Sequence, residues 1–225
     1  PSPSPTPTED PAYEDVQKNS IDFTKIKIVN DQMGYYPKSE KTSKLGVELS
    51  KSNGKVDFDW LKRNGIDFVM LKIGGRGYES GVISLDEQFT DYIEAAKKAD
   101  LDIGVSFYSQ AVSVTEAVEE ANFVVNQLQS YTIRYPVALV MEEITNDTAR
   151  TDTLSVDQRS RIAEAFLQTI QYDGYHAILY GNEQWLMEKI RPDGLLTDYD
   201  VLLNDTNPLP EYPYEFKMWR YATDI

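Results

Sequence analysis

The chain has 225 residues, a formal charge of −15 and an isoelectric point near 4.5. A surface this acidic repels phosphate backbones, which argues against nucleic acid as a partner. The sequence has no Cys and a single His, His176, so we expect neither a metal site nor a cofactor. The apolar run around His176 predicts a packed or rim side chain. No run of about 18 apolar residues is present, so no membrane span is expected.

The first residues, PSPSPTPTEDP, alternate Pro with Ser or Thr. This composition stays extended and solvated, so residues 1–20 are expected to be a linker that packs little against a domain. Such spacers commonly tether exported domains, so we expect a targeting or anchoring segment before Pro1 and an extracellular or cell-surface place in a bacterium. Residues 21–43 form an N-terminal extension of unassigned role, with one possible strand from Phe23 to Val29.

From Leu45 onward, apolar strands alternate with amphipathic helices. The expected strands span residues 45–49, 66–73, 101–108, 137–141, 175–180, 199–204 and 216–221. The expected helices, caps included, run over residues 58–64, 84–99, 113–128, 155–174 and 182–190. This alternation predicts an α/β fold with a parallel sheet. The number of units favours a closed barrel over an open sheet, that is an irregular, TIM-like (β/α) barrel over residues 44–225 with five β/α units followed by extra strands.

Helix starts are marked by side chains that can cap the first turn. Asp57 precedes the first helix, which Gly65 ends. Three further starts carry Ser followed three residues later by Glu or Gln, the pattern of a capping box. These pairs are Ser84 with Glu87, Ser113 with Glu116, and Ser155 with Gln158.

The stretch YPVALVMEEI, residues 135–144, contains the most informative carboxylates. A short strand runs directly into Glu142 and Glu143, and strand alternation places Val140 and Glu142 on one face. Barrels of this kind place their catalytic residues at the C-terminal ends of their strands. The alternative is that the two Glu residues only mark the strand's exit into solvent.

Several segments together resemble glycoside hydrolase family 25, the Chalaropsis-type lysozymes or N-acetylmuramidases. They are LGVELSKSNGKVDFDWLKRNGIDFVMLKIGGRGY, EAVEEANFVV, YPVALVMEE, GYHAILYGNEQWL and FKMWRY. The likeness covers roughly residues 44–221 and preserves order and spacing. It implies bacterial cell-wall peptidoglycan as the partner, with cleavage of the β-1,4 bond between N-acetylmuramic acid and N-acetylglucosamine.

The resemblance also implies site residues. Glu142 matches the family's proposed general acid, and Glu48 stands where the first strand usually has Asp. The fourth strand usually reads D-x-E, and its Asp, thought to assist attack by the substrate's acetamido group, falls on Val140. The implied catalytic residues are therefore Glu142 and Glu48.

Other positions of the family pattern are partly kept. Arg76, Tyr180 and Trp219 fit it, and Tyr221 closes a Trp219-Arg220-Tyr221 sequence where the family has W-Q-Y. We expect Arg76, Tyr180, Trp219 and Tyr221 to bind substrate and to converge with the carboxylates. The family's aromatic on the third strand is replaced by Ser106, and its final strand has no counterpart.

These departures predict a weakened or lost activity, because Val140 can neither orient an amide nor stabilise positive charge. Three interpretations stay open. The protein is a hydrolase that uses Glu48 as its second carboxylate, or a non-catalytic domain that binds wall glycan or another partner, or a surface spacer without a ligand.

Overall fold

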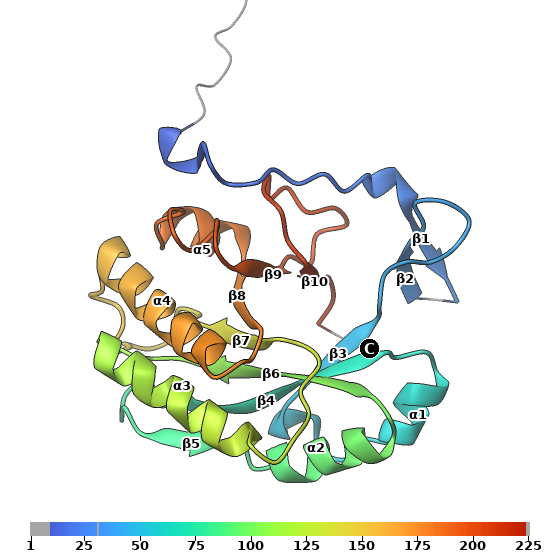
Figure 1. Cartoon of the computed structure of the whole chain (residues 1–225), viewed down its shortest axis with the longest axis horizontal. Coiled ribbons are helices and arrows are strands. Elements are labelled where there is room, and N and C mark those ends of the chain that lie inside the picture. The colour runs from blue at the N-terminus through green and yellow to red at the C-terminus, as the bar shows by residue number, and fades with distance from the viewer. Residues whose placement is uncertain (1–9, 31, 224–225) are drawn as a thin grey trace, which may run out of the picture.

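The computed structural model describes residues 10–30 and 32–223. A curled, mainly parallel sheet forms a half-barrel that carries its helices on the outer side, and a small hairpin stands apart near the N-terminus (Figure 1). The α/β class and the parallel sheet predicted from the sequence are therefore confirmed.

The elements follow the predicted alternation from Gly46 to the end of the described chain. The strands are β1 Ile26–Val29, β2 Gln32–Tyr35, β3 Gly46–Leu49, β4 Phe68–Arg76, β5 Ile83–Leu85, β6 Asp102–Tyr108, β7 Val137–Val140, β8 Ala177–Gly181, β9 Asp200–Asn204 and β10 Met218–Arg220. The helices are α1 Phe58–Arg63, α2 Phe89–Lys98, α3 Val114–Leu128, α4 Val156–Tyr172 and α5 Glu183–Glu188. Short 3-10 turns cover Pro11–Tyr13, Phe23–Lys25 and Lys51–Asn53.

The large sheet has the order β10-β9-β8-β7-β6-β4-β3, and all neighbours along this path are parallel. β5 adds to β4 in antiparallel orientation. β3 and β10 therefore lie at the two ends of the sheet, each with one free edge. This arrangement leaves one side of the half-barrel open.

The two faces of the sheet bury different side chains, because successive strand residues point in opposite directions. The outer face packs on the helices; in β4 it contributes Val69, Leu71 and Ile73, all with 0% exposure. The inner face forms a separate apolar cluster. Its buried members are Met70, Ala138, Val140, Ile178, Tyr180 and Leu202.

Most of the predicted caps are present. Asp57 accepts a hydrogen bond from the Trp60 amide, and Ser155 forms a full capping box with Gln158. The predicted Ser84 cap is wrong, because Ser84 lies within β5 and α2 begins only at Phe89. Pairing with the end of β4 holds this segment extended, which outweighs the local capping pattern.

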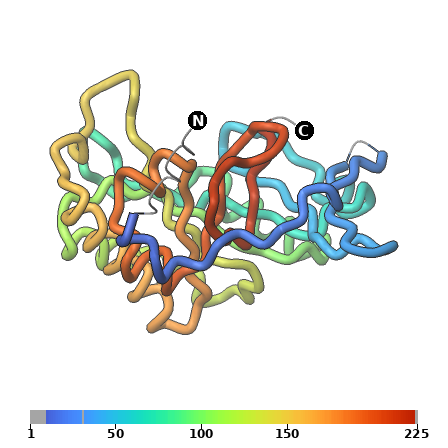
Figure 2. The backbone as a smooth tube through the Cα atoms, turned by 90° about the horizontal axis from the view of Figure 1, so that it is seen from above, coloured from blue at the N-terminus to red at the C-terminus, as the bar shows by residue number. Residues whose placement is uncertain are grey.

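The N-terminal segment differs from the expectation of a linker that packs little. Tyr13 and Val16 are buried, and the Tyr13 hydroxyl donates a 2.8 Å hydrogen bond to the Met187 carbonyl. Figure 2 shows this segment beside the loop between β9 and β10, where the Glu215 amide bonds the Gln17 carbonyl at 2.8 Å. Residues 10–20 are thus part of the packed structure, whereas residues 1–9 lie outside the described residues.

The extension over residues 21–43 contains the antiparallel β1–β2 hairpin. β1 agrees with the second half of the predicted strand, while β2 was not expected. Cross-strand pairs include Ile26 with Tyr35 and Ile28 with Met33. The hairpin lies beside the open side of the half-barrel (Figure 1).

Across the described ranges 10–30 and 32–223, the structure contains no helix that is both long and apolar enough to cross a membrane.

Candidate functional site

Glu48 anchors a polar cluster on the inner face of the half-barrel. It lies on β3, with its side chain 23% exposed. The Ser106 hydroxyl donates to its carboxylate at 3.3 Å and the Tyr108 hydroxyl at 3.4 Å, both from β6. Strand alternation explains why Ser106 and Tyr108 share this face. Burial raises the pKa of Glu48, and the Arg220 charge opposes that rise.

Arg220, on β10, supplies the cationic partner of Glu48. Its Nε lies 3.2 Å from a Glu48 carboxylate oxygen, and its Nη1 donates to Asn204 Oδ1 at 3.1 Å. β9 and β10 are in register at this point, which brings Asn204 and Arg220 side by side. The Glu48 carboxylate is therefore neutralised locally and is held by three donors.

Glu142 lies two residues beyond the end of β7, and its side chain is exposed. Its backbone carbonyl accepts a 3.3 Å hydrogen bond from the Gln110 side chain. Its charge is close enough to Glu48 to oppose ionisation of that carboxylate, as one of the smaller contributions after burial. Glu142 therefore combines access to solvent with proximity to the inner-face cluster.

Val140 occupies the inner face directly before Glu142, as the sequence predicted. It is 1% exposed. The sheet register places it between Tyr108 on β6 and Tyr180 on β8, the two strands that flank β7. Tyr180 is 3% exposed, and burial, followed by the charge of Glu142, raises its pKa well above the ordinary value. The surroundings of Val140 thus hold phenol groups and no second carboxylate from β7.

Trp219 and Tyr221 flank Arg220 in the chain and pack toward the N-terminal extension. The Trp219 ring lies edge-on to Phe23 at 6.4 Å and to Tyr221 at 5.7 Å. The Trp219 indole donates a 2.6 Å hydrogen bond to the Asp205 carbonyl. Both rings also line the cavity that Glu48, Tyr180 and Arg220 line, so the structure brings them together with Glu48.

Arg76 is not brought together with the other predicted site residues. It points to the helix side of the sheet, where its Nε lies 2.7 Å from Glu120 and its Nη2 lies 3.1 Å from Glu119, both on α3. It also donates to the Gly81 carbonyl at 2.8 Å. The expectation that Arg76 converges with Glu48 and Glu142 is corrected by these contacts, which make it a buried structural residue.

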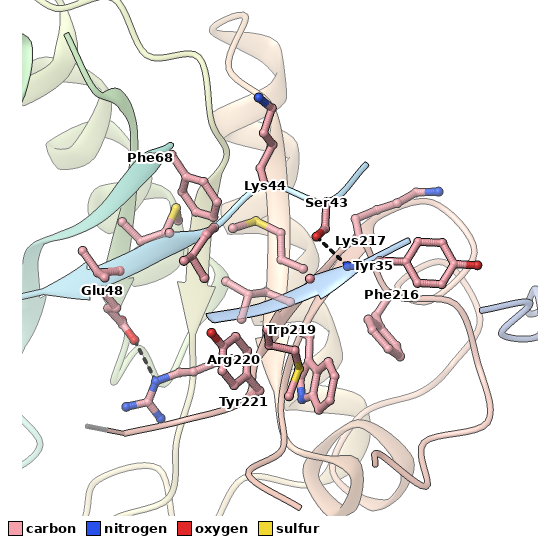
Figure 3. A pocket seen from close by; sticks show the side chains of 18 of the residues that line it. Tyr35, Ser43, Lys44, Glu48, Phe68, Phe216, Lys217, Trp219, Arg220 and Tyr221 are labelled. Carbon is pink, nitrogen blue, oxygen red and sulfur yellow. Dashed lines mark hydrogen bonds and ion pairs between the residues drawn. The ribbon is translucent and has the colours of Figure 1, made fainter. Parts of the chain in front are cut away.

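A cavity of about 480 Å³ opens between β3, β10 and the β1–β2 hairpin. We call it the seam cavity, because it lies along the open side of the sheet. Glu48 and Arg220 stand at one end of it, and Phe68 and Tyr35 line other parts (Figure 3). In the described part of the chain, no three His, Cys, Asp or Glu side chains are grouped so that they could hold a metal ion.

His176 immediately precedes β8 and lies at the opposite end of this strand from the cluster. Its Nε2 lies 2.8 Å from Asp200 Oδ2, and its side chain is 53% exposed. It is therefore a rim residue, as one of the two sequence interpretations had it.

Sequence reasoning identified Glu48 and Glu142 but assigned no role to Arg220, Asn204 or Tyr108. Alternation along β6 could have placed Tyr108 on the face of Ser106. The pairing of Arg220 with Glu48 had no local signal, because 172 positions separate the two residues and only the curl of the sheet joins them. Chemically, the cluster offers one solvent-accessible carboxylate, Glu142, and one carboxylate held in an ion pair.

Comparisons with known proteins agree with this architecture. A family model described as "Glycosyl hydrolases family 25" matches residues 47–224. No curated protein sequence matches the chain.

Solved structures give the same picture of the fold. The modular autolysin LytC from Streptococcus pneumoniae is similar with a TM-score of 0.71 and 18% identity, over 89% of this chain and 48% of that one. A family 25 glycosyl hydrolase from Bacillus anthracis is similar with a TM-score of 0.66 and 15% identity, over 80% and 79% of the two chains. The spore cortex lytic enzyme SleM from Clostridium perfringens gives a TM-score of 0.66 and 16% identity, over 78% and 60%. The present chain thus spans about half the length of LytC.

Proposed function

Because the chain belongs to glycosyl hydrolase family 25, we propose that its half-barrel engages bacterial cell-wall peptidoglycan at the sheet end where Glu142 and Tyr180 lie. The neighbouring LytC has been solved with a synthetic peptidoglycan ligand, and SleM is described as a lytic enzyme of the spore cortex. The exposed Glu142 beyond β7 supports this placement.

Hydrolysis of the muramic acid–glucosamine bond is weak or absent in this proposal. The observation that carries it is the 3.2 Å ion pair between Glu48 and Arg220. A glycosidase of this type needs one carboxyl group to protonate the leaving oxygen and a second negative group to stabilise the oxocarbenium-like state. Glu142 can serve as the acid, but Glu48 is neutralised and Val140 carries no charge.

The expected loss in the rate of hydrolysis can be sized from the missing electrostatic contact. Removal of one preorganised group of this kind typically costs about 3–4 kcal/mol, or roughly 10²–10³ in rate. The ion pair with Arg220 also ties down the carboxylate of Glu48, and a misplaced catalytic group alone can cost about 10² in rate. The two losses need not add, since the residues act on one reaction centre.

A non-catalytic, glycan-binding surface domain is the second candidate function. The same ion pair favours it, because a charge-balanced cluster presents donors and acceptors to sugar hydroxyls without a free nucleophile. The two candidates share their ligand and differ in whether the bond is broken.

The proposal also covers the domain boundaries and the location of the protein. We take the half-barrel as an irregular TIM-like barrel of five β/α units followed by extra strands over residues 44–225, with residues 21–43 as an extension. We place the domain outside the cell or on its surface.

Two measurements on purified, crosslinked bacterial walls test the function. The protein should sediment with the walls while leaving the turbidity of the suspension nearly constant. Glu142→Ala should reduce sedimentation, because it removes an exposed side chain at the proposed contact surface, whereas the distant, exposed Tyr172→Ala should leave it unchanged. Absence of sedimentation by the unchanged protein would contradict the assignment of peptidoglycan.

A further inference from the structure

The seam cavity is lined mainly by apolar and aromatic side chains. Of its 25 lining residues, eight are aromatic and eight more are aliphatic or Met. The volume of about 480 Å³ lies within the range of about 300–1,000 Å³ that is typical of small-molecule pockets. A cavity with this lining needs an occupant that is itself largely apolar.

The walls of the seam cavity are built by specific features of the chain. Phe68 stacks on Tyr135 with ring centroids 4.0 Å apart and lies over the start of β3. Gly46 permits this, because a Cβ at that position would come within 2.2 Å of the Phe68 ring. On the opposite side, Met33 and Tyr35 of the hairpin line the cavity.

Two polar side chains along the body of the cavity, Ser43 and Lys44, already have protein partners. The Ser43 hydroxyl accepts a 2.9 Å hydrogen bond from the Tyr35 amide, and Lys44 pairs with Asp67 at 3.2 Å. Sugar hydroxyls placed against the aliphatic and Met side chains of this wall would lack partners, at a cost for each one. An apolar body loses nothing there and gains from leaving water.

The end of the cavity that Glu48 and Arg220 form is polar. Arg220 uses Nε for Glu48 and Nη1 for Asn204, and a guanidinium carries five N–H donors. Further donors therefore remain for an acceptor atom of a ligand. Because Glu48 balances the positive charge of Arg220, an uncharged head group fits this end better than an anion.

We propose that the seam cavity binds a small amphiphile, with an apolar body between the hairpin and the sheet and an uncharged hydrogen-bonding head group against Arg220. The cavity shares Glu48, Tyr180 and Arg220 with the proposed glycan contact, and an amphiphilic ligand goes beyond the proposed function. The apolar body can be an acyl chain or an aromatic ring system, and both share the chemistry that the cavity recognises.

The probe for this proposal is N-phenyl-1-naphthylamine, a neutral dye that fluoresces in apolar surroundings. The full chain should bind it saturably with one site per molecule. Met33→Trp on the hairpin and Met218→Phe on β10 both fill the cavity and should weaken binding by roughly tenfold or more. Val29→Trp places similar bulk on the same hairpin, outside the cavity lining, and should bind like the unchanged chain.

Competition identifies the ligand class and the head group. Decanol and 2-naphthol should displace the dye, and the stronger of the two shows whether an acyl or an aromatic body is preferred. Decanoate should displace it less well than decanol. Circular dichroism of each variant confirms that it folds.

Three results would overturn the proposal. They are dye binding that never saturates, equal binding by Met33→Trp, Met218→Phe and Val29→Trp, or stronger displacement by decanoate. Because no peptidoglycan is present in this assay, its failure leaves the wall-sedimentation result intact, and the two proposals fail separately.

Discussion

The guanidinium of Arg220, on the last strand of the open sheet, lies 3.2 Å from the carboxylate of Glu48, on the first. This one ion pair spans the side on which β3 and β10 have no strand between them. It joins the ends of the half-barrel and at the same time removes a free carboxylate from the inner face. The same contact thus affects both the closure of the half-barrel and the charge available on its inner face.

Breaking this pair should cost stability. Arg220→Met leaves Glu48 partly buried without a cation, so we expect a loss of about 1–3 kcal/mol in the free energy of unfolding, measured by urea denaturation at neutral pH. Arg134→Met removes a more exposed pair with Asp102, whose side chains are 69% and 37% exposed. That control should change stability by less than about 0.5 kcal/mol. Equal effects of the two substitutions would show that the Glu48–Arg220 pair is no better than a surface contact.

Glu120 should make stability depend on pH. Its side chain is fully buried beside Arg76, and burial raises its pKa from 4.5 to about 7. Between these two values the folded protein holds a proton that the unfolded chain releases. Stability from this group is therefore complete below about 4.5 and is lost as the pH rises through about 7.

Comparison with Glu120→Gln isolates this contribution from the other acidic groups. Between pH 5 and pH 8, the unchanged protein should lose about 2–3 kcal/mol more stability than the variant. Urea denaturation at several pH values gives both slopes. Parallel curves for the two proteins would mean that Glu120 is ionised throughout and is fully stabilised by Arg76.

The N-terminal segment should contribute to stability through Tyr13. This ring stacks on Tyr214 with centroids 5.0 Å apart, and its hydroxyl bonds the Met187 carbonyl. Tyr13→Ala should destabilise the protein by about 2–4 kcal/mol, seen as a clear fall in melting temperature. Tyr172→Ala, at a side chain that is 92% exposed, is the matched control. No difference between the two variants would restore the interpretation of this segment as a linker.

The sequence was sufficient for elements whose signals are local. The Asp57 cap, the Ser155–Gln158 capping box and the apolar β7 before Glu142 were all predicted close to their observed bounds. The sequence was insufficient where contacts between residues far apart in the chain determine the local structure. Ser84 carried a capping pattern, but pairing with β4 made it part of a strand.

The residues of the candidate site fall into the same two groups: those with a local sequence signal and those placed only by long-range contacts. Glu142 and Val140 could be placed on one face from alternation along a single strand. Arg76 fitted a family pattern, yet its ion pairs with α3 take it to the opposite face of the sheet. The role of Arg220 depends on the closure of the sheet, which no local spacing encodes.

Restoring the family's charges should restore some hydrolysis. Val140→Asp places a carboxylate on the inner face next to Glu142, and Arg220→Gln releases Glu48 from its cation. We expect the double variant to hydrolyse peptidoglycan at least roughly tenfold faster than the unchanged protein, because it regains negative charge opposite the acid. Val140→Leu with Arg220→Gln controls for the change in volume. Equal rates for both double variants would mean that the substrate pocket itself has changed.

The central claim is that Glu142 lacks a second functional carboxylate, and reducing-end release from purified peptidoglycan tests it most directly. The unchanged protein should release reducing ends no faster, or only slightly faster, than Glu142→Gln, while still sedimenting with the walls. Turnover like that of an ordinary lysozyme, abolished by Glu142→Gln, would contradict the claim. It would show that Glu48 performs the second role despite its ion pair with Arg220.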